Sequence, residues 1–220
     1  MSKKTFRFRL YPTAAQRDVL DGQLRLCCEL YNAALQERRD AWRLARVSIK
    51  FAGQSAQLPA IKVERPDVAG VYSQALQDVL HRVDKAFGAF FGRVRRGERA
   101  GFPRFRASRR FDSLTYPQLG FYVDGRHLHV SKIGAVKIKL HRPIEGTIKT
   151  LNIKREAGKW FACFSAEINP VLLPASAEAI GVDVGLNHLA VTSNGEKYAN
   201  EHFLKDFLTR VRSASKDLSR

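Results

Sequence analysis

The sequence lacks the features of a secreted or membrane protein. No apolar run approaches the roughly 20 residues needed to cross a bilayer, and the opening Met1-Ser-Lys-Lys-Thr-Phe-Arg contains no apolar signal core. The three cysteines include an adjacent pair, Cys27 and Cys28, that cannot close an ordinary disulfide, and no C-x-x-C spacing is present. We therefore expect a cytoplasmic chain with reduced, buried thiols, no membrane partner and no zinc site.

The common catalytic motifs are also missing. The sequence contains no G-x-x-x-x-G-K-[ST], no H-E-x-x-H and no G-x-S-x-G. Its six histidines are scattered, and only His127 and His129 lie at a spacing that would place both on one face of a strand. Without a further ligand in register, such a pair is more typical of a surface than of a metal site. We expect no small-molecule substrate.

Negative charge is scarce. The 220 residues contain 38 Lys and Arg against 21 Asp and Glu, which gives a formal net charge of +17. This balance is typical of proteins that bind polyanions. The hydrophobic fraction of 45% is that of a chain with an ordinary core, so we expect a folded protein and not a basic tail.

The first hundred residues predict one strand followed by helices. In Lys4–Leu10, phenylalanine alternates with arginine, which indicates a half-buried strand within residues 1–12. Residues 13–100 then predict a helical unit. Thr13 and Gln16 have capping-box spacing before a long helix to Ala45, and a broad apolar face indicates a second helix over Ser73–Arg95. Gly53–Pro66 reads as a loop between them.

The second half predicts strands. In residues 101–170, Asp124-Gly125 and Ala157-Gly158 mark two hairpins, and residues 135–140 alternate apolar and basic side chains. Together with the first strand they predict an antiparallel β-barrel. Residues 171–178 read as a linker. Residues 179–220 predict a separate α/β segment, with a buried strand at 179–185, strands at 188–192 and 196–199, and a helix over 201–220. The fold class is therefore α+β.

The strongest binding signal lies between Arg93 and Arg110. This segment contains eight arginines and one acid, Glu98, interleaved with Phe102, Pro103 and Phe105. Guanidinium groups match the geometry of phosphates and stack on bases. The alternative is a solvated basic loop. The candidate nucleic-acid-binding residues of this segment are Arg93, Arg95, Arg96, Arg99, Arg104, Arg106, Arg109 and Arg110.

A second basic face is expected on the sheet. Strand alternation would place Arg7, Arg9, Lys137 and Lys139 on one side, together with Lys132, His141 and Arg142. A binding groove and an ordinary solvated sheet face are both compatible with this pattern, because lysine is common on strands that must not aggregate.

Asp183 is the candidate catalytic and metal-binding residue. It lies within the apolar run Gly181-Val-Asp-Val-Gly185, where an unpaired buried charge would be costly, so a metal is a natural partner. Nucleases that use two magnesium ions need several carboxylates, and one Asp does not suffice. An Asp that accepts backbone hydrogen bonds near a strand end is the structural alternative. A third possibility is the Asp-x-Gly hairpin of actin-like and sugar-kinase ATPases.

Four motifs, taken in order, resemble one known family. They are Phe8-Arg-Leu-Tyr-Pro12 with Gln16, Leu30-Tyr-Asn32, Gly101-Phe-Pro-Arg-Phe-Arg106, and Gly181-Val-Asp-Val-Gly185. In this order they resemble the OrfB/TnpB proteins of bacterial insertion sequences, relatives of the type V CRISPR effectors. The resemblance implies a wedge-type β-barrel interrupted by a helical recognition unit, then the N-terminal part of an RNase H-like (RuvC) nuclease domain. Asp183 would be its first catalytic carboxylate and a Mg²⁺ ligand.

The resemblance also implies partners. A transposon-derived guide RNA would pair with target DNA, so the protein would work in the bacterial cytoplasm and associate with the nucleoid when bound to DNA. The family's later catalytic Glu, zinc ribbon and last catalytic Asp have no counterpart in this sequence. We therefore expect no tightly bound Mg²⁺ and no DNA cleavage by this chain alone. A nuclease-dead, RNA-guided DNA-binding regulator is the alternative function.

Overall fold

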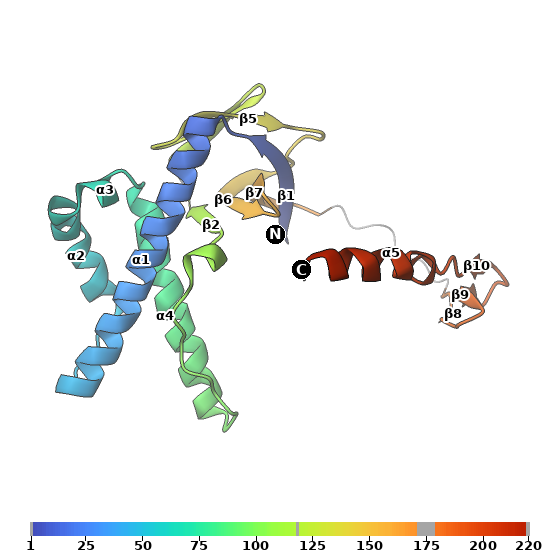
Figure 1. Cartoon of the computed structure of the whole chain (residues 1–220), viewed down its shortest axis with the longest axis horizontal. Coiled ribbons are helices and arrows are strands. Elements are labelled where there is room, and N and C mark those ends of the chain that lie inside the picture. The colour runs from blue at the N-terminus through green and yellow to red at the C-terminus, as the bar shows by residue number, and fades with distance from the viewer. Residues whose placement is uncertain (1, 118, 171–178, 219–220) are drawn as a thin grey trace. The chain divides into compact units, whose positions relative to one another are not determined.

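The computed structural model describes residues 2–117, 119–170 and 179–218, which fall into two compact units divided after Pro170. The expected linker, residues 171–178, lies outside the described residues. The first unit combines helices with an antiparallel sheet (Figure 1). None of the helices in the described ranges is long and apolar enough to cross a membrane.

A seven-stranded sheet organises the first unit. Its order is β2-β6-β7-β1-β5-β4-β3, and every pairing is antiparallel. The predicted antiparallel assembly is therefore present, as a nearly closed sheet that includes the first strand. The strands are β1 (Ser2–Tyr11), β2 (Ser113–Tyr116), β3 (Phe121–Asp124), β4 (His127–Val130), β5 (Gly134–Lys139), β6 (Thr147–Glu156) and β7 (Lys159–Ile168).

Two long helices lie between β1 and β2 in the chain. Helix α1 (Ala14–Ala45) begins at the predicted capping box, in which the Gln16 backbone N–H donates to Thr13 Oγ1 at 3.2 Å and Gln16 Oε1 accepts from the Thr13 N–H at 3.0 Å. Helix α4 spans Ser73–Arg95, as the apolar periodicity predicted. Both helix predictions are confirmed.

The predicted loop over residues 53–66 is wrong. Helix α2 (Phe51–Glu64) runs through it, with Pro59 inside, and the short α3 (Pro66–Ala69) follows. Tertiary contacts override the weak local signal: Gln54 is buried, donates to the Ala34 carbonyl at 2.8 Å and accepts from Arg38 Nε at 2.8 Å. These bonds hold α2 against α1.

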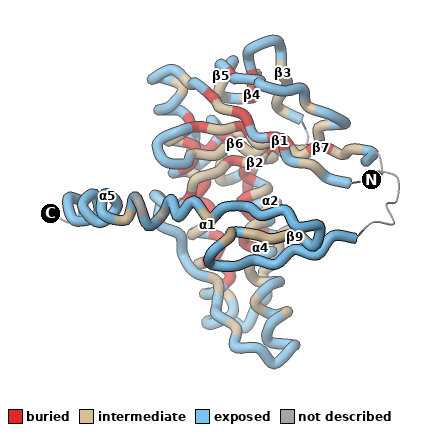
Figure 2. The backbone as a smooth tube through the Cα atoms, turned by 90° about the vertical axis from the view of Figure 1, so that its right-hand side faces the viewer, coloured by how far each residue is buried: buried red, intermediate tan, exposed pale blue. Residues whose placement is uncertain are grey.

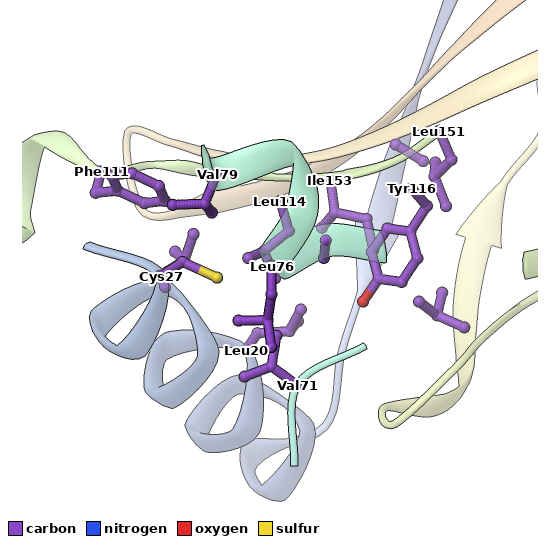
Figure 3. Packing of buried hydrophobic residues seen from close by; sticks show 14 of the residues in the cluster. Leu20, Cys27, Val71, Leu76, Val79, Phe111, Leu114, Tyr116, Leu151 and Ile153 are labelled. Carbon is purple, nitrogen blue, oxygen red and sulfur yellow. The ribbon is translucent and has the colours of Figure 1, made fainter. Parts of the chain in front are cut away.

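The core joins the helices to one face of the sheet (Figure 3). Leu20 and Leu76 from the helices pack near Leu114, Tyr116 and Ile153 from the strands, and all five are buried. The apolar side chains of β1 that alternate with arginine, Phe6, Phe8 and Leu10, are buried as well. The period-2 pattern of β1 therefore separates a core face from a basic outer face.

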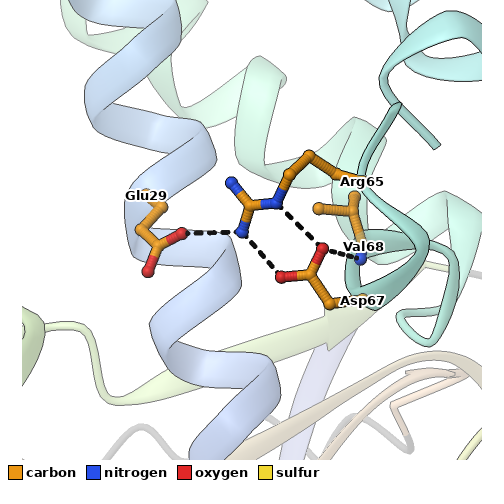
Figure 4. Close-up of polar contacts among 4 residues, drawn as sticks. All are labelled: Glu29, Arg65, Asp67 and Val68. Atoms are coloured by element: carbon orange, nitrogen blue, oxygen red, sulfur yellow. Dashed lines mark hydrogen bonds and ion pairs between the residues drawn. The ribbon is translucent and has the colours of Figure 1, made fainter. Parts of the chain in front are cut away.

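Arg65 ties the start of α3 to α1 (Figure 4). Its Nη2 lies 2.6 Å from Asp67 Oδ2 and 3.3 Å from Glu29 Oε2, and Asp67 Oδ1 accepts from the Val68 N–H at 3.0 Å. The Arg65 guanidinium, with the Val68 N–H, holds the pKa of the Asp67 carboxyl below its usual range.

The second unit contains a small sheet and one helix. Strands β8 (Val182–Asp183), β9 (His188–Thr192) and β10 (Lys197–Ala199) pair in the order β10-β9-β8, and α5 (Phe203–Leu218) follows. The predicted buried strand at 179–185 is wrong, because β8 has two residues and both are exposed. Figure 2 shows most of this unit in the colour of exposed residues.

Candidate nucleic-acid interface

The arginine-rich segment 93–110 runs from the last turn of α4 to the 3₁₀ helix η1 (Ser108–Arg110). All eight of its arginines are exposed. Arg96 pairs with Glu98; in the described part of the chain, the other seven have no carboxylate within ion-pair distance. The segment is therefore a line of solvent-facing cations with little internal neutralisation, and this favours an anionic partner.

Asn32 fixes the backbone of this segment against α1. Its side-chain Oδ1 accepts from the Arg106 N–H at 2.8 Å, and its Nδ2 donates to the Arg106 carbonyl at 2.9 Å. The Cys28 thiol donates to the same carbonyl at 3.3 Å. Although residues 99–107 form no helix or strand, these bonds give the chain a defined path there.

Aromatic side chains of the same segment pack against both long helices. The Phe102 ring lies 5.5 Å from the Phe87 ring and 5.4 Å from the Phe90 ring, both on α4. The Arg39 guanidinium of α1 lies 5.3 Å from the Phe105 ring. Phe102 and Phe105 remain about half exposed, so part of each ring is free to contact a ligand. Basic groups and partly exposed rings along one path are typical of surfaces that bind single-stranded nucleic acid.

The outer face of the sheet brings together the four predicted strand cations. Arg9 is the register partner of Lys139, and Lys137 is the partner of Tyr11. Arg7 and Arg9 point to the same side because they alternate with buried Phe6 and Phe8. The predicted clustering of Arg7, Arg9, Lys137 and Lys139 on one side of the sheet follows from this register.

Two of the other three residues expected on that face lie against the core side of β1. The His141 ring lies 5.1 Å from the ring of Phe8, and the Arg142 guanidinium lies 5.4 Å from the ring of Phe6. Both rings belong to the core side of β1. Lys132 lies in the turn between β4 and β5, where its φ is 66°. The prediction was wrong for His141 and Arg142 because they lie outside the strands, where alternation does not apply, and for the same reason alternation assigns no face to Lys132.

Two residues of the outer face were not predicted from the sequence. The Phe161 ring lies 3.8 Å from the Arg7 guanidinium and 5.2 Å from that of Arg9, so it forms a platform beneath both. Lys154 is the register partner of Phe161. The sequence predicts the hairpin that carries both residues. Only the register across β6, β7 and β1 shows that they lie beside Arg7 and Arg9.

Charge on this face is partly neutralised. Glu156 pairs with Lys154 at 3.3 Å and with Arg7 at 3.1 Å, and these cations lower the pKa of its carboxyl, with the Lys154 hydrogen bond the largest cause. Arg9 differs, because its Nη1 is buried and has no hydrogen-bond partner among the described residues. Arg9 therefore has a buried guanidinium donor that no acceptor in the described residues uses.

Asp183 has a different environment from the one that the sequence suggested. It is exposed on β8 and is the register partner of Val191 on β9. The premise of a buried charge in need of a partner is wrong. Among the described residues, no three His, Cys, Asp or Glu side chains gather closely enough to hold a metal ion. Asp183 is a single accessible carboxylate at the edge of a small sheet.

Comparison with known proteins gives the same family that the motifs indicated. Residues 1–46 match the OrfB IS605 helix-turn-helix domain. A Streptomyces pristinaespiralis protein named as an RNA-guided DNA endonuclease is 29% identical across 99% of this chain and 55% of its own length. The Escherichia coli K12 protein InsQ, named likewise, is 25% identical across 99% of this chain and 54% of its length.

Two of the solved structures that match this chain are Cas12f complexes. One is a Cas12f1–sgRNA–target DNA complex, with a TM-score of 0.47, 14% identity, and coverage of 98% of this chain and 62% of that one. Another is a CRISPR–Cas12f ternary complex, with a TM-score of 0.48, 12% identity, and coverage of 92% and 53%.

The chain spans about half the length of the curated relatives that it matches. The matched domain contains β1 and the whole of α1, including the capping box and Asn32, and the two relatives align from end to end of the sequence. The chain is thus similar to the OrfB/TnpB proteins, through the helix-turn-helix domain over residues 1–46 and through two relatives that align with 99% of the sequence.

Proposed function

We propose that this chain is the nucleic-acid-binding part of an RNA-guided DNA endonuclease and that it holds a guide RNA transcribed from a transposon end. In this arrangement base pairing between RNA and DNA supplies the choice of target, and the protein contributes backbone contacts and positioning. The observation that carries the proposal is the exposed arginine segment 93–110, whose backbone is held in place by Asn32.

Two basic surfaces would share the RNA and DNA. The first is the segment 93–110; the second is the outer face of the sheet, with Arg7, Arg9, Lys137 and Lys139. The nearly closed sheet would act as the wedge-type barrel of the family, with residues 13–100 as its helical recognition unit. Each cation that contacts a phosphate releases counterions and adds to affinity, so binding should weaken steeply with salt.

Residues 179–220 would form the N-terminal part of a RuvC-like nuclease domain, and Asp183 would be its first catalytic carboxylate. A magnesium ion bound there would generate the attacking hydroxide and stabilise the leaving oxygen. The described residues do not fit such a site by themselves, because no three His, Cys, Asp or Glu side chains among them gather closely enough to hold a metal ion. We therefore propose that this chain does not cut DNA unless further carboxylates are supplied.

The test begins with the RNA that copurifies with the chain from its host. This RNA would be sequenced, transcribed in vitro and titrated at several salt concentrations against three proteins. They are the unaltered chain, the double variant Arg104→Ala/Arg106→Ala, and a control of equal charge loss, Arg17→Ala/Arg25→Ala, whose arginines are exposed on α1.

A discrete transposon-end RNA and a selective loss of affinity in Arg104→Ala/Arg106→Ala are expected. The slope of log K against log salt should fall by about 0.7 to 0.9 for each phosphate contact removed, and hardly at all in the control. Equal effects of the two double variants would mean that only net charge matters. Heterogeneous RNA would mean that the chain binds RNA through its charge alone, as any basic protein does, and would contradict the proposal.

A further inference from the structure

A cavity of about 670 Å³ is lined by residues of α1 and α4, by residues 47–50 after α1, and by Phe102 of the arginine-rich segment. One side of it is aromatic: Phe87, Phe90 and Phe91 of α4 with Phe102 of the arginine-rich segment. These rings contact one another edge-on or at a tilt, with centroids 5.1 to 5.5 Å apart for Phe87–Phe102, Phe90–Phe91 and Phe90–Phe102. Such a volume accommodates a nucleobase with its ribose.

The opposite side contains Trp42 of α1, whose side chain is 55% exposed. Phe91 is 54% exposed. Unpaired bases stack on aromatic rings that line a cavity and remain half exposed. Gly88 lies among the lining residues, and a Cβ built there would meet no atom within 4 Å, so the cavity is open at this point of α4.

The lining is also positively charged. It includes Arg38, Arg39, Arg43 and Lys50 against one carboxylate, Asp84. Asp40, which is not part of the lining, lies 3.8 Å from Arg39 Nε and 3.7 Å from Arg43 Nη2, so it offsets these cations only partly. An apolar cavity with a cationic rim selects a ligand that is both flat and anionic, which describes a nucleotide better than it describes an apolar helix.

Arg38 provides an independent indication of a ligand. It is 8% exposed; its Nε donates to Gln54 Oε1 at 2.8 Å and its Nη1 donates to Asp84 Oδ1 at 3.0 Å. Its Nη2 is buried and has no hydrogen-bond partner in the described structure. A buried guanidinium donor without an acceptor is costly, and the carbonyl oxygen of a base is the kind of acceptor that it lacks.

From these observations we propose that the cavity between Trp42 and the phenylalanines of α4 binds one unpaired base of a single-stranded RNA loop. This inference rests on the proposed RNA-binding function and adds a specific subsite to it. RNA is the occupant because its loops present unstacked bases that aromatic and arginine side chains capture, whereas the bases of duplex DNA are stacked and paired.

The test uses two RNAs with the same stem: a hairpin with a loop of unpaired adenosines, and a fully paired blunt duplex without a loop. Binding is followed by tryptophan fluorescence. Trp42 is the reporter, because the only other tryptophan, Trp160, is 3% exposed. Trp42→Phe keeps a ring in the cavity and removes the signal. A DNA hairpin with the same loop distinguishes the two nucleic acids.

Gly88→Leu fills the cavity without changing any charge, and Gly88→Ala is the matched control, since both replace a helical glycine with a better helix former. The unaltered chain should bind the looped RNA about tenfold more tightly than the duplex and show quenching. Gly88→Leu should lose both the preference and the quenching while it still binds the duplex, and Gly88→Ala should keep them.

An unchanged loop preference in a folded Gly88→Leu variant would overturn the subsite, as would equal binding of looped and paired RNA by the unaltered chain. Preference for the DNA hairpin would overturn the choice of RNA. In each of these cases the chain still binds nucleic acid, so the proposed function stands. Absence of any RNA binding would overturn both.

Discussion

Asn32 and Arg106, 74 positions apart in the sequence, exchange two hydrogen bonds of 2.8 and 2.9 Å between an amide side chain and a backbone. The bonds join two of the motifs that identified the family, Leu30-Tyr-Asn32 and Gly101–Arg106. The Arg106 guanidinium also lies 5.1 Å from the ring of Tyr31, the residue before Asn32. A conformational role for Asn32 follows: it holds a basic segment that has no secondary structure of its own over residues 99–107.

We predict that Asn32→Ala loosens this segment. The two bonds are partly solvent-exposed, so the free energy of unfolding should fall by only about 0.5 to 2 kcal/mol. Trypsin should cleave after Arg104 and Arg106 several times faster than in the unaltered chain, and RNA affinity should fall. Asn152→Ala is the control, because Asn152 also joins segments far apart in the sequence, through a 3.1 Å bond to Thr115 on the neighbouring strand. Equal cleavage rates in the two variants would show that Asn32 does not restrain the segment.

Asp183→Ala should change stability by less than about 0.5 kcal/mol, because Asp183 is exposed on the two-residue strand β8. With magnesium present, neither the chain nor this variant should cut DNA that is complementary to the bound RNA. The measurement is gel analysis of labelled plasmid and oligonucleotide targets. Magnesium-dependent cleavage by the unaltered chain that disappears in Asp183→Ala would contradict the proposal that the catalytic set is incomplete.

The thiols should differ in reactivity. Burial raises the pKa of Cys27 to about 12, and Cys163, which is less buried, also has a raised pKa. In the folded chain at pH 8, iodoacetamide should modify Cys163 at least about tenfold faster than Cys27, as read by peptide mass spectrometry. Denaturant should abolish the difference. Comparable rates in the folded chain would show that Cys27 is accessible.

Burial of the Cys27 thiol also affects the stability of the chain at alkaline pH. The folded pKa of Cys27 lies above that of an unfolded thiol, about 8.5, so its stabilising contribution is complete below that pH and is lost as the pH rises toward 12. The melting temperature should therefore fall less between pH 8 and 10 in Cys27→Ala than in the unaltered chain. Parallel falls would mean that other groups account for the alkaline loss.

Acid should weaken the contacts of Asp67. Its pKa is lowered in the folded chain, chiefly by the hydrogen bond from Arg65, so its contribution is present above the pKa of an unfolded aspartate and is lost as the pH falls through the lower folded value. The stability of the unaltered chain should drop more steeply than that of Asp67→Asn between about pH 4 and pH 2. NMR titration of the Asp67 carboxyl gives the folded pKa directly. A value at or above that of a free aspartate would refute the assignment.

The parts of the fold with strong local signals were predictable. The long periodic helices α1 and α4 and the hairpin turns at Asp124-Gly125 and Ala157-Gly158 lie where the sequence placed them. Helix α2 was not predictable, because Gly53 and Pro59 disfavour a helix and the bonds of buried Gln54 to α1 outweigh them. Strand β2 was missed, since its four residues are ordered by pairing with β6 and carry no turn signal.

The candidate site was likewise predictable only where the sequence signal is local. Composition alone located the arginines of residues 93–110 and the alternation of β1 located Arg7 and Arg9, because both are local patterns. The anchoring role of Asn32 and the position of Phe161 beneath two arginines depend on contacts between distant residues. The burial of Asp183 was predicted wrongly, because an apolar run indicates a strand but not whether another layer covers it.

The place of β1 in the sheet has a consequence during protein synthesis. Its partners β5 and β7 are made much later, and when Tyr11 leaves the ribosome about 120 residues remain before β5 begins. At about 5 to 20 residues per second, the nascent strand waits roughly 6 to 24 seconds without a partner. Lys3, Lys4, Arg7 and Arg9 place repelling charges along it during that time. Arg7 and Arg9, proposed above to contact nucleic acid, would thus also help, with Lys3 and Lys4, to keep newly made chains from pairing with one another on a polysome.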